Sequence, residues 1–125
     1  MRVECAVIIG VFGPGHLSGK VYSNYNFLGD KLDGYANLKR IVTGGGVGVE
    51  QLALRYATEN GIEPEVIPPN IKVHGKEFAF VFRNQEIIEV IDIGVLLWNG
   101  TDQLYYKLMQ DFVERKTPLH VYGCE

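Results

Sequence analysis

Cysteine is scarce in this chain of 125 residues, and its two cysteines, Cys5 and Cys124, lie near the ends. Two cysteines placed in this way cannot form the disulfide framework of a small secreted domain, and neither has a cysteine or histidine at the spacing of a metal site. His16 has no second ligand at such a spacing either. We therefore expect a reduced, cytoplasmic protein that needs no metal and no cofactor.

An excess of positive charge is also absent. Lysine and arginine number 12 against 15 aspartates and glutamates, which gives a net charge of −3, and the basic residues are scattered along the chain. This distribution argues against nucleic acid as a partner. The longest apolar run, 6–12, is far shorter than the roughly 20 residues that span a bilayer, and it lacks the flanks of a signal peptide. We therefore expect a soluble protein without a membrane partner.

The sequence is rich in apolar residues, at 46% hydrophobic content, which suits a single domain over 1–125. Short β-branched runs alternate with segments of helical periodicity, the pattern of parallel βαβ units. Right-handed crossovers then predict an α/β fold with a Rossmann-like, doubly wound parallel sheet in the order 3-2-1-4-5, flanked by helices. The expected strands are 7–12, 40–43, 93–98 and 119–122, with a short third strand in "EVIPPN" (65–70) that Pro68 and Pro69 stop. The expected helices are 25–32, 49 to about Gly61, 76–91 and 103–115.

Four glycines follow the second expected strand in the segment "VTGGGVGVEQLALRYA", namely Gly44, Gly45, Gly46 and Gly48. They lead directly into a helix, at the carboxyl edge of the sheet where open α/β sheets bind ligands. Glycines leave backbone N–H groups accessible, and a helix N-terminus favours an anion. The segment therefore predicts a cradle for phosphate, with Glu50 in the first turn reaching a hydroxyl or a sugar. The alternative is a tight turn in which Glu50 interacts only with the helix dipole.

A second candidate segment, "LLWNGTDQ", lies where the fourth expected strand ends. Asn99, Gly100, Thr101 and Asp102 lead from this strand into a helix, and residues of these types commonly form turns and cap helices. Ligand binding is the alternative role, because this loop faces the same crevice as the glycine loop. Trp98 is a candidate either for the core or for a wall against a base.

Three segments resemble the SLOG superfamily, which includes the DprA and Lonely Guy relatives, and within it the small YspA-like branch. They are "VTGGGVGVEQLALRYATENGIEPEVIPPN", "RNQEIIEVIDIGVLLWNGTDQ" and "PLHVY", and they occur in the right order over residues 40–122. The resemblance places Glu50 where the branch has an aspartate. It assigns ligand-binding positions to Thr43, Gly44, Gly45, Gly48, Arg83, Asn84, Trp98, Asn99 and Gly100.

The resemblance implies a Rossmann-like sheet and a ligand that is a nucleotide or derives from one. The phosphoribohydrolase branch carries P-G-G-x-G-T-x-x-E after strand four, whereas this chain has "WNGTDQLYY", with Asp102 as its only carboxylate. Without the glutamate of that motif, we expect a protein that binds a nucleotide-derived small molecule, such as a signalling nucleotide, as a sensor or to sequester it. The alternative is a nucleotide N-glycoside hydrolase that uses Glu50 or Asp102 as its carboxylate.

The helix expected at 76–91 has more apolar surface than one sheet can cover. A helix that packs on a sheet needs an apolar stripe of only about 100° or a little more. The excess predicts either contact with a neighbouring helix or a homodimer or larger homo-oligomer. The apolar residues that spread over more than half of its circumference are Phe78, Phe80, Val81, Phe82, Ile87, Ile88, Val90 and Ile91.

Overall fold

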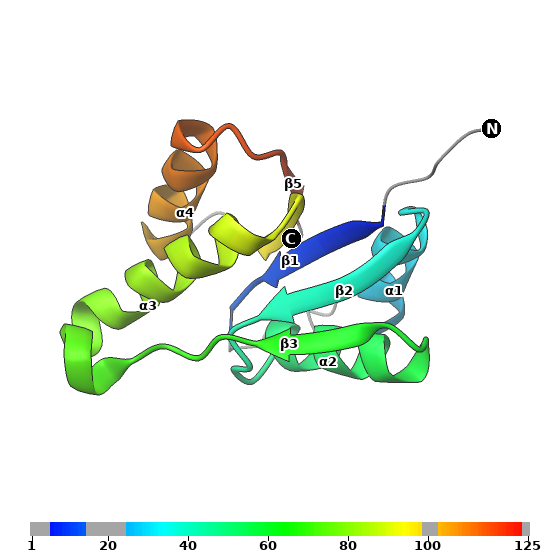
Figure 1. The fold of residues 1–125 in the computed structure, drawn as a ribbon, viewed down its shortest axis with the longest axis horizontal. Helices are drawn as coiled ribbons and strands as arrows, with labels where there is room; N and C mark the ends of the chain where they lie inside the picture. The colour runs from blue at the N-terminus through cyan, green and yellow to red at the C-terminus, as the bar shows by residue number, and fades with distance from the viewer. Residues whose placement is uncertain (1–5, 15–24, 99–102, 124–125) are drawn as a thin grey trace.

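A computed structural model describes residues 6–14, 25–98 and 103–123 (Figure 1). The strands are β1 (Val7–Phe12), β2 (Leu38–Thr43), β3 (Glu63–Val66), β4 (Ile93–Trp98) and β5 (Leu119–Gly123), and the helices are α1 (Tyr25–Asp33), α2 (Val49–Glu59), α3 (Ile71–Val90) and α4 (Gln103–Glu114). The strands form one sheet in the order β3-β2-β1-β4-β5, and every neighbouring pair is parallel. The predicted fold class and strand order are confirmed.

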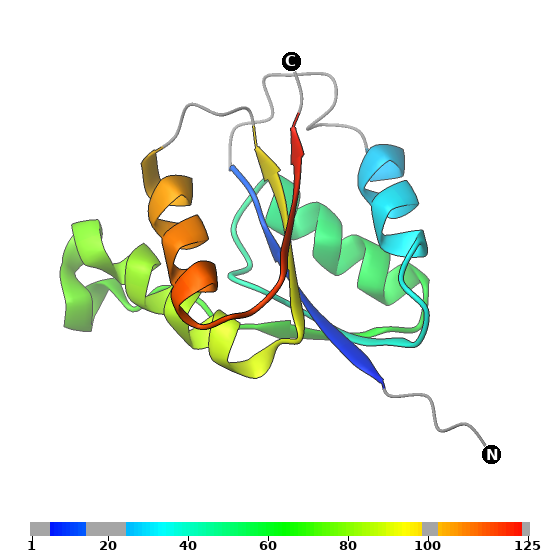
Figure 2. The same cartoon turned by 90° about the horizontal axis from the view of Figure 1, so that it is seen from above.

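Helices cover both faces of the sheet (Figure 2). Helices α1 and α2 pack on one face and α3 and α4 on the other, so the protein has two apolar cores. Side chains of β4 alternate between them: Val95 and Leu97 belong to the core on the α1 and α2 side, and Leu96 and Trp98 to the other. Burial on both faces explains why the central strands read as continuous apolar runs.

The third strand differs from the prediction. β3 comprises Glu63–Val66 and pairs in register with β2, so it begins before the predicted segment 65–70 and ends before Pro68 and Pro69, as predicted. Pro64 lies within the strand because β3 is at the edge of the sheet, where a missing N–H need not interrupt a ladder. Pro68 and Pro69 follow the strand and do not belong to it.

Helix α3 begins at Ile71, before the predicted start at 76. The side chain of Asn70 caps it, because its oxygen accepts a hydrogen bond from the N–H of Val73 at 3.2 Å. The helical geometry is interrupted at Gly75, which has φ 78°, and the part after Gly75 corresponds to the helix that the sequence predicts. The beginning of α3 extends beyond the sheet in two perpendicular views (Figures 1 and 2).

Candidate functional site

A cavity of about 540 Å³ opens at the carboxyl edge of the sheet. Its volume lies in the range typical of small-molecule sites. Segments that follow the central strands supply its walls, as expected at the point where the chain connections of a doubly wound sheet diverge. The described residues that line it are Gly13 and Pro14 after β1, Gly44, Gly45, Gly46, Val47 and Glu50 after β2, Pro69 after β3, Phe80 and Arg83 from α3, and Leu104 and Tyr105 from α4.

The glycines after β2 serve different structural purposes. Gly45 and Gly48 have φ of 76° and 86°, a region that other residues rarely adopt. Gly44 has no positive φ, but a Cβ at this position would lie only 2.0 Å from Nη1 of Arg83. Gly45 and Gly48 therefore allow the turn, and Gly44 allows the close approach of a side chain from α3.

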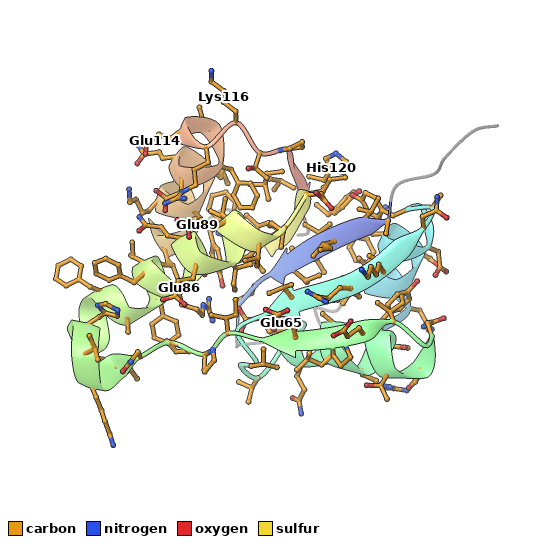
Figure 3. All side chains as sticks on the ribbon, in the orientation of Figure 1. Glu65, Glu86, Glu89, Glu114, Lys116 and His120 are labelled. Atoms are coloured by element: carbon orange, nitrogen blue, oxygen red, sulfur yellow. The ribbon has the colours of Figure 1, made fainter. Side chains whose placement is uncertain are left out.

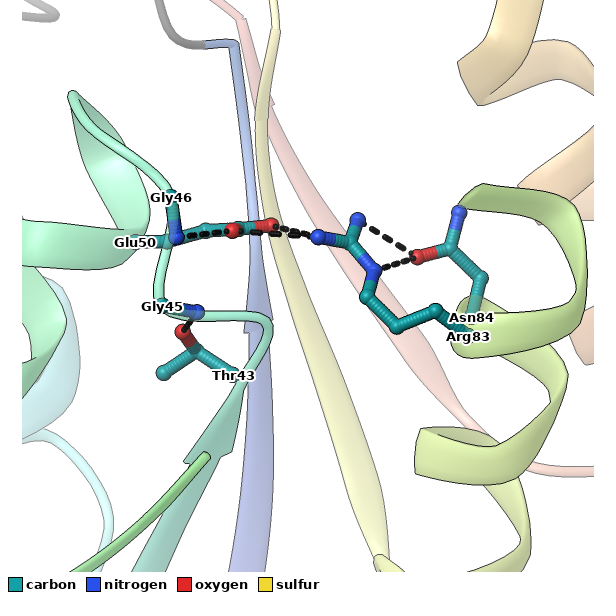
Figure 4. A network of polar contacts seen from close by, with 6 residues as sticks. All are labelled: Thr43, Gly45, Gly46, Glu50, Arg83 and Asn84. Atoms are coloured by element: carbon teal, nitrogen blue, oxygen red, sulfur yellow. Dashed lines mark hydrogen bonds and ion pairs between the residues drawn. The ribbon is translucent and has the colours of Figure 1, made fainter. Parts of the chain in front are cut away.

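Glu50 lies in the first turn of α2 and is almost completely buried, with 4% of its surface exposed. Its Oε1 accepts a hydrogen bond from the N–H of Gly46 at 2.9 Å. Nη1 of Arg83 lies 3.2 Å from Oε1 and 3.2 Å from Oε2 (Figure 4). The carboxylate therefore connects the glycine loop to α3, a larger role than interaction with the helix dipole alone.

Arg83 is held from two sides. Besides the contact with Glu50, its Nε and Nη2 donate to Oδ1 of Asn84 at 3.1 Å and 2.8 Å. Its guanidinium carbon lies 5.2 Å from the centre of the Phe80 ring, within the range of a cation–π interaction. Arg83 and Asn84 are 4% and 1% exposed. Packing and hydrogen bonds thus fix the guanidinium at the wall of the cavity.

Thr43 contacts the glycine loop from the end of β2. Its hydroxyl is buried at the end of β2 and accepts a hydrogen bond from the N–H of Gly45 at 2.8 Å (Figure 4). Together with Glu50, it supplies internal acceptors to two successive amides of the loop, those of Gly45 and Gly46. Side chains from the end of β2 and the first turn of α2 therefore hold the glycine loop in place.

The structure brings most of the predicted site residues together. Thr43, the glycine loop, Glu50, Arg83 and Asn84 form one network (Figure 4). Trp98 is 8% exposed and belongs to the core on the α3 and α4 side, in edge contact with Tyr106. The remaining predicted residues, Asn99, Gly100, Thr101 and Asp102, lie outside the described residues.

Sequence reasoning missed the apolar walls of the cavity. Phe80 precedes Arg83 by one helical turn, so the two side chains share a side of α3. That spacing could have identified Phe80 from the sequence. Tyr105 lies in the first turn of α4, at the same edge of the sheet, and Pro69 follows β3. No local pattern marks these two residues, because only the tertiary structure brings them to the cavity.

Other kinds of site find no support within the described ranges. Those residues contain no group of three or more His, Cys, Asp and Glu side chains able to hold a metal ion. None of the helices found there is both long and apolar enough to cross a membrane.

The sequence matches no model of a known protein family and none of the curated proteins compared with it.

Proposed function

We propose that this protein binds a nucleotide-derived small molecule in the cavity at the carboxyl edge of the sheet and does not turn it over. The observation that carries the proposal is the composition of that cavity. A glycine loop and the buried pair of Glu50 and Arg83 form its polar part, and Phe80 from α3 and Tyr105 from α4 add aromatic surface. A largely apolar pocket with a few convergent polar groups suits a base and a sugar. The SLOG resemblance supports the same class of ligand.

The contacts that hold the carboxylate of Glu50 favour binding without turnover. Among the described lining residues, Glu50 is the only one with a carboxylate, and Arg83 and Gly46 both hold it. Cleavage of an N-glycosidic bond needs a carboxylate placed to act as nucleophile or to stabilise developing positive charge. A carboxylate already neutralised by an arginine supplies little of that stabilisation. Glu50 therefore contributes to affinity and to loop structure.

Phe80 offers a direct test of the cavity. We expect Phe80→Ala to weaken the binding of nucleosides or nucleotides by about tenfold, equivalent to about 1.4 kcal/mol, because a stacking surface is lost. Val113→Ala is the control, since Val113 lies on α4, is 77% exposed and is not a lining residue. Isothermal titration calorimetry with a panel of nucleosides and nucleotides gives the affinities. Binding that is equal in both folded variants would contradict the proposal.

We also propose that copies of the chain associate through α3. Phe78 and Phe82 lie one turn apart and are 59% and 44% exposed, and Val73 at the start of the helix is 69% exposed. The ring of His74 stacks on Phe82 with centroids 4.1 Å apart. Intramolecular packing thus buries Ile87 and Ile88 but leaves Phe78 and Phe82 partly exposed to solvent. An exposed apolar cluster of this kind is typical of an interaction surface.

The charges on α3 favour a second copy in antiparallel orientation. The exposed lysines Lys72 and Lys76 lie near the beginning of the helix. The exposed glutamates Glu86 and Glu89 lie in its later part (Figure 3). This polarity is opposite to the one that the helix dipole favours. Glu89 also contacts Arg115 at 2.8 Å but keeps 59% of its side chain exposed. An antiparallel partner would place the basic end of each helix near the acidic end of the other.

Light scattering tests this association. We expect a dimer for the unmodified chain at micromolar concentration and a monomer for the double variant Phe78→Ser with Phe82→Ser. Val113→Ser is the matched control, because Val113 is an exposed apolar residue on α4, at 77% exposure. It should leave the dimer intact. A monomeric unmodified chain, or a double variant that associates like it, would contradict the proposal.

A further inference from the structure

The negative charge of Glu50 and the positive charge of Arg83 cancel among the described residues that line the cavity. Glu50 and Arg83 are the only charged side chains among the described lining residues, and they form an ion pair at 3.2 Å. Their side chains are 5% and 4% exposed, so solvent screens the pair poorly. A phosphate inside the cavity would put a second anion beside the carboxylate of Glu50, and among the described lining residues only the guanidinium of Arg83 could neutralise both. Such a burial of uncompensated charge is unfavourable.

Two of the backbone donors that a phosphate cradle would use are already engaged. The N–H of Gly46 donates to Glu50, and the N–H of Gly45 donates to Thr43. To use the N–H of Gly46, a phosphate would have to displace the carboxylate of Glu50 and compete with it for Arg83. Glu50 itself thus occupies the position of the anion at the start of α2.

The other groups that line the cavity suit an uncharged molecule. Phe80, Tyr105 and Leu104 present rings and apolar surface, which fit a planar base. An ionised carboxylate has about four acceptor positions, so the contacts with Gly46 and Arg83 leave Glu50 able to accept a bond from a sugar hydroxyl. Hydroxyl donors therefore complement the polar side of the cavity better than phosphate does.

We infer that the cavity holds the base and sugar of the ligand and that its phosphate groups lie outside, toward solvent. This inference rests on the proposed function and specifies which part of the ligand gives the affinity. It assigns to the glycine loop a role different from the phosphate cradle that its glycines predict: the loop positions the carboxylate of Glu50, and Glu50 selects a neutral, hydroxyl-bearing group.

A matched titration series tests the inference. The probes are adenosine, guanosine, cytidine and uridine, their 5′-monophosphates, and inorganic pyrophosphate as competitor, each measured by calorimetry at one ionic strength. For the base that binds most tightly, we expect the monophosphate to bind no more than about tenfold more tightly than the nucleoside, and pyrophosphate not to displace either. A larger advantage of the monophosphate, or displacement by pyrophosphate, overturns this inference and leaves the proposed function standing. Binding of none of the probes contradicts the proposed function and this inference with it.

Glu50→Gln isolates the charge. Glutamine keeps an acceptor for the N–H of Gly46 but leaves the charge of Arg83 uncompensated, so the advantage of the monophosphate over the nucleoside should rise by about tenfold. Glu59→Gln is the matched control, since Glu59 lies on the same helix, is exposed and does not line the cavity. An unchanged ratio in folded Glu50→Gln overturns the inference. If this variant does not fold, the ratio of monophosphate affinity to nucleoside affinity in the unmodified chain tests the inference by itself.

Discussion

Replacing Gly44 by alanine tests the network that connects the glycine loop to α3. The new Cβ would lie 2.0 Å from Nη1, 2.7 Å from Cζ and 2.8 Å from Cδ of Arg83. Three atoms along the arginine are thus in collision, so the whole side chain must move away from Glu50. The backbone itself is not strained, because Gly44 has no positive φ. The perturbation is therefore confined to the contact between the loop and Arg83.

The expected loss of stability follows from the burial of the pair. Separating Arg83 from Glu50 leaves both charges in surroundings with less than a tenth of their surface exposed. Breaking a buried ion pair costs about 3–5 kcal/mol, and alanine returns about 0.4–1 kcal/mol by restricting the unfolded chain. We expect Gly44→Ala to lower the free energy of unfolding by about 2–5 kcal/mol.

Urea denaturation followed by circular dichroism measures this change. The matched control is Gly34→Ala, where a Cβ would meet only the carbonyl oxygen of Lys31 at an ordinary 3.4 Å. It should leave the stability unchanged or raise it by up to about 1 kcal/mol. In an Arg83→Ala background, Gly44→Ala should have little further effect, because alanine lacks all three of the colliding atoms. A Gly44→Ala variant within about 0.5 kcal/mol of the unmodified chain would refute the reasoning.

Two further substitutions test the packing against the sheet. A Cβ on Gly94 would lie 2.3 Å from Cζ of Phe112, so Gly94→Ala should lower the free energy of unfolding by about 1–3 kcal/mol. Adding Phe112→Leu should recover part of this loss, and a purely additive double variant would contradict the explanation. Burial and the hydrogen bond to Asp33 raise the pKa of the Tyr56 hydroxyl. The folded state then holds this proton more tightly than the unfolded state, so stability falls as the pH rises above about 10. Tyr56→Phe should make that fall shallower, and identical profiles from about pH 8 to 11 would contradict the assignment.

The topology was predictable because the central strands are buried on both faces. β1 and β4 have the predicted bounds, since a continuous β-branched run between turn residues is typical of a strand buried on both faces. The end of α2 was predictable as well, since Gly61 follows it with φ 68°. The end of β3 before Pro68 was predictable, but its start at Glu63 was not, because Pro64 reads as a strand breaker until the strand is known to lie at the edge.

The candidate site was predictable only in part. The glycine loop was placed correctly, because its residues follow a strand and open a helix. Glu50 and Arg83 are 33 positions apart, so no local spacing joins them, and Arg83 was identified through the family resemblance alone. Phe80 and Tyr105 come to the cavity only through the packing of α3 and α4 beside the strand ends. The pairing of Glu50 with Arg83, on which the proposal for the ligand rests, depends on those tertiary contacts.

The most direct test of the central proposal is a titration of isotope-labelled protein with the nucleosides and their 5′-monophosphates, followed by amide N–H correlation spectra. Our account predicts that at least one base shifts the amides of Gly44–Glu50 and Phe80–Asn84, which lie at or beside the cavity wall. Amides of α1 (Tyr25–Asp33), which contributes no described lining residue, should be unaffected. Spectra that none of these compounds changes, or changes concentrated in α1, would contradict the account.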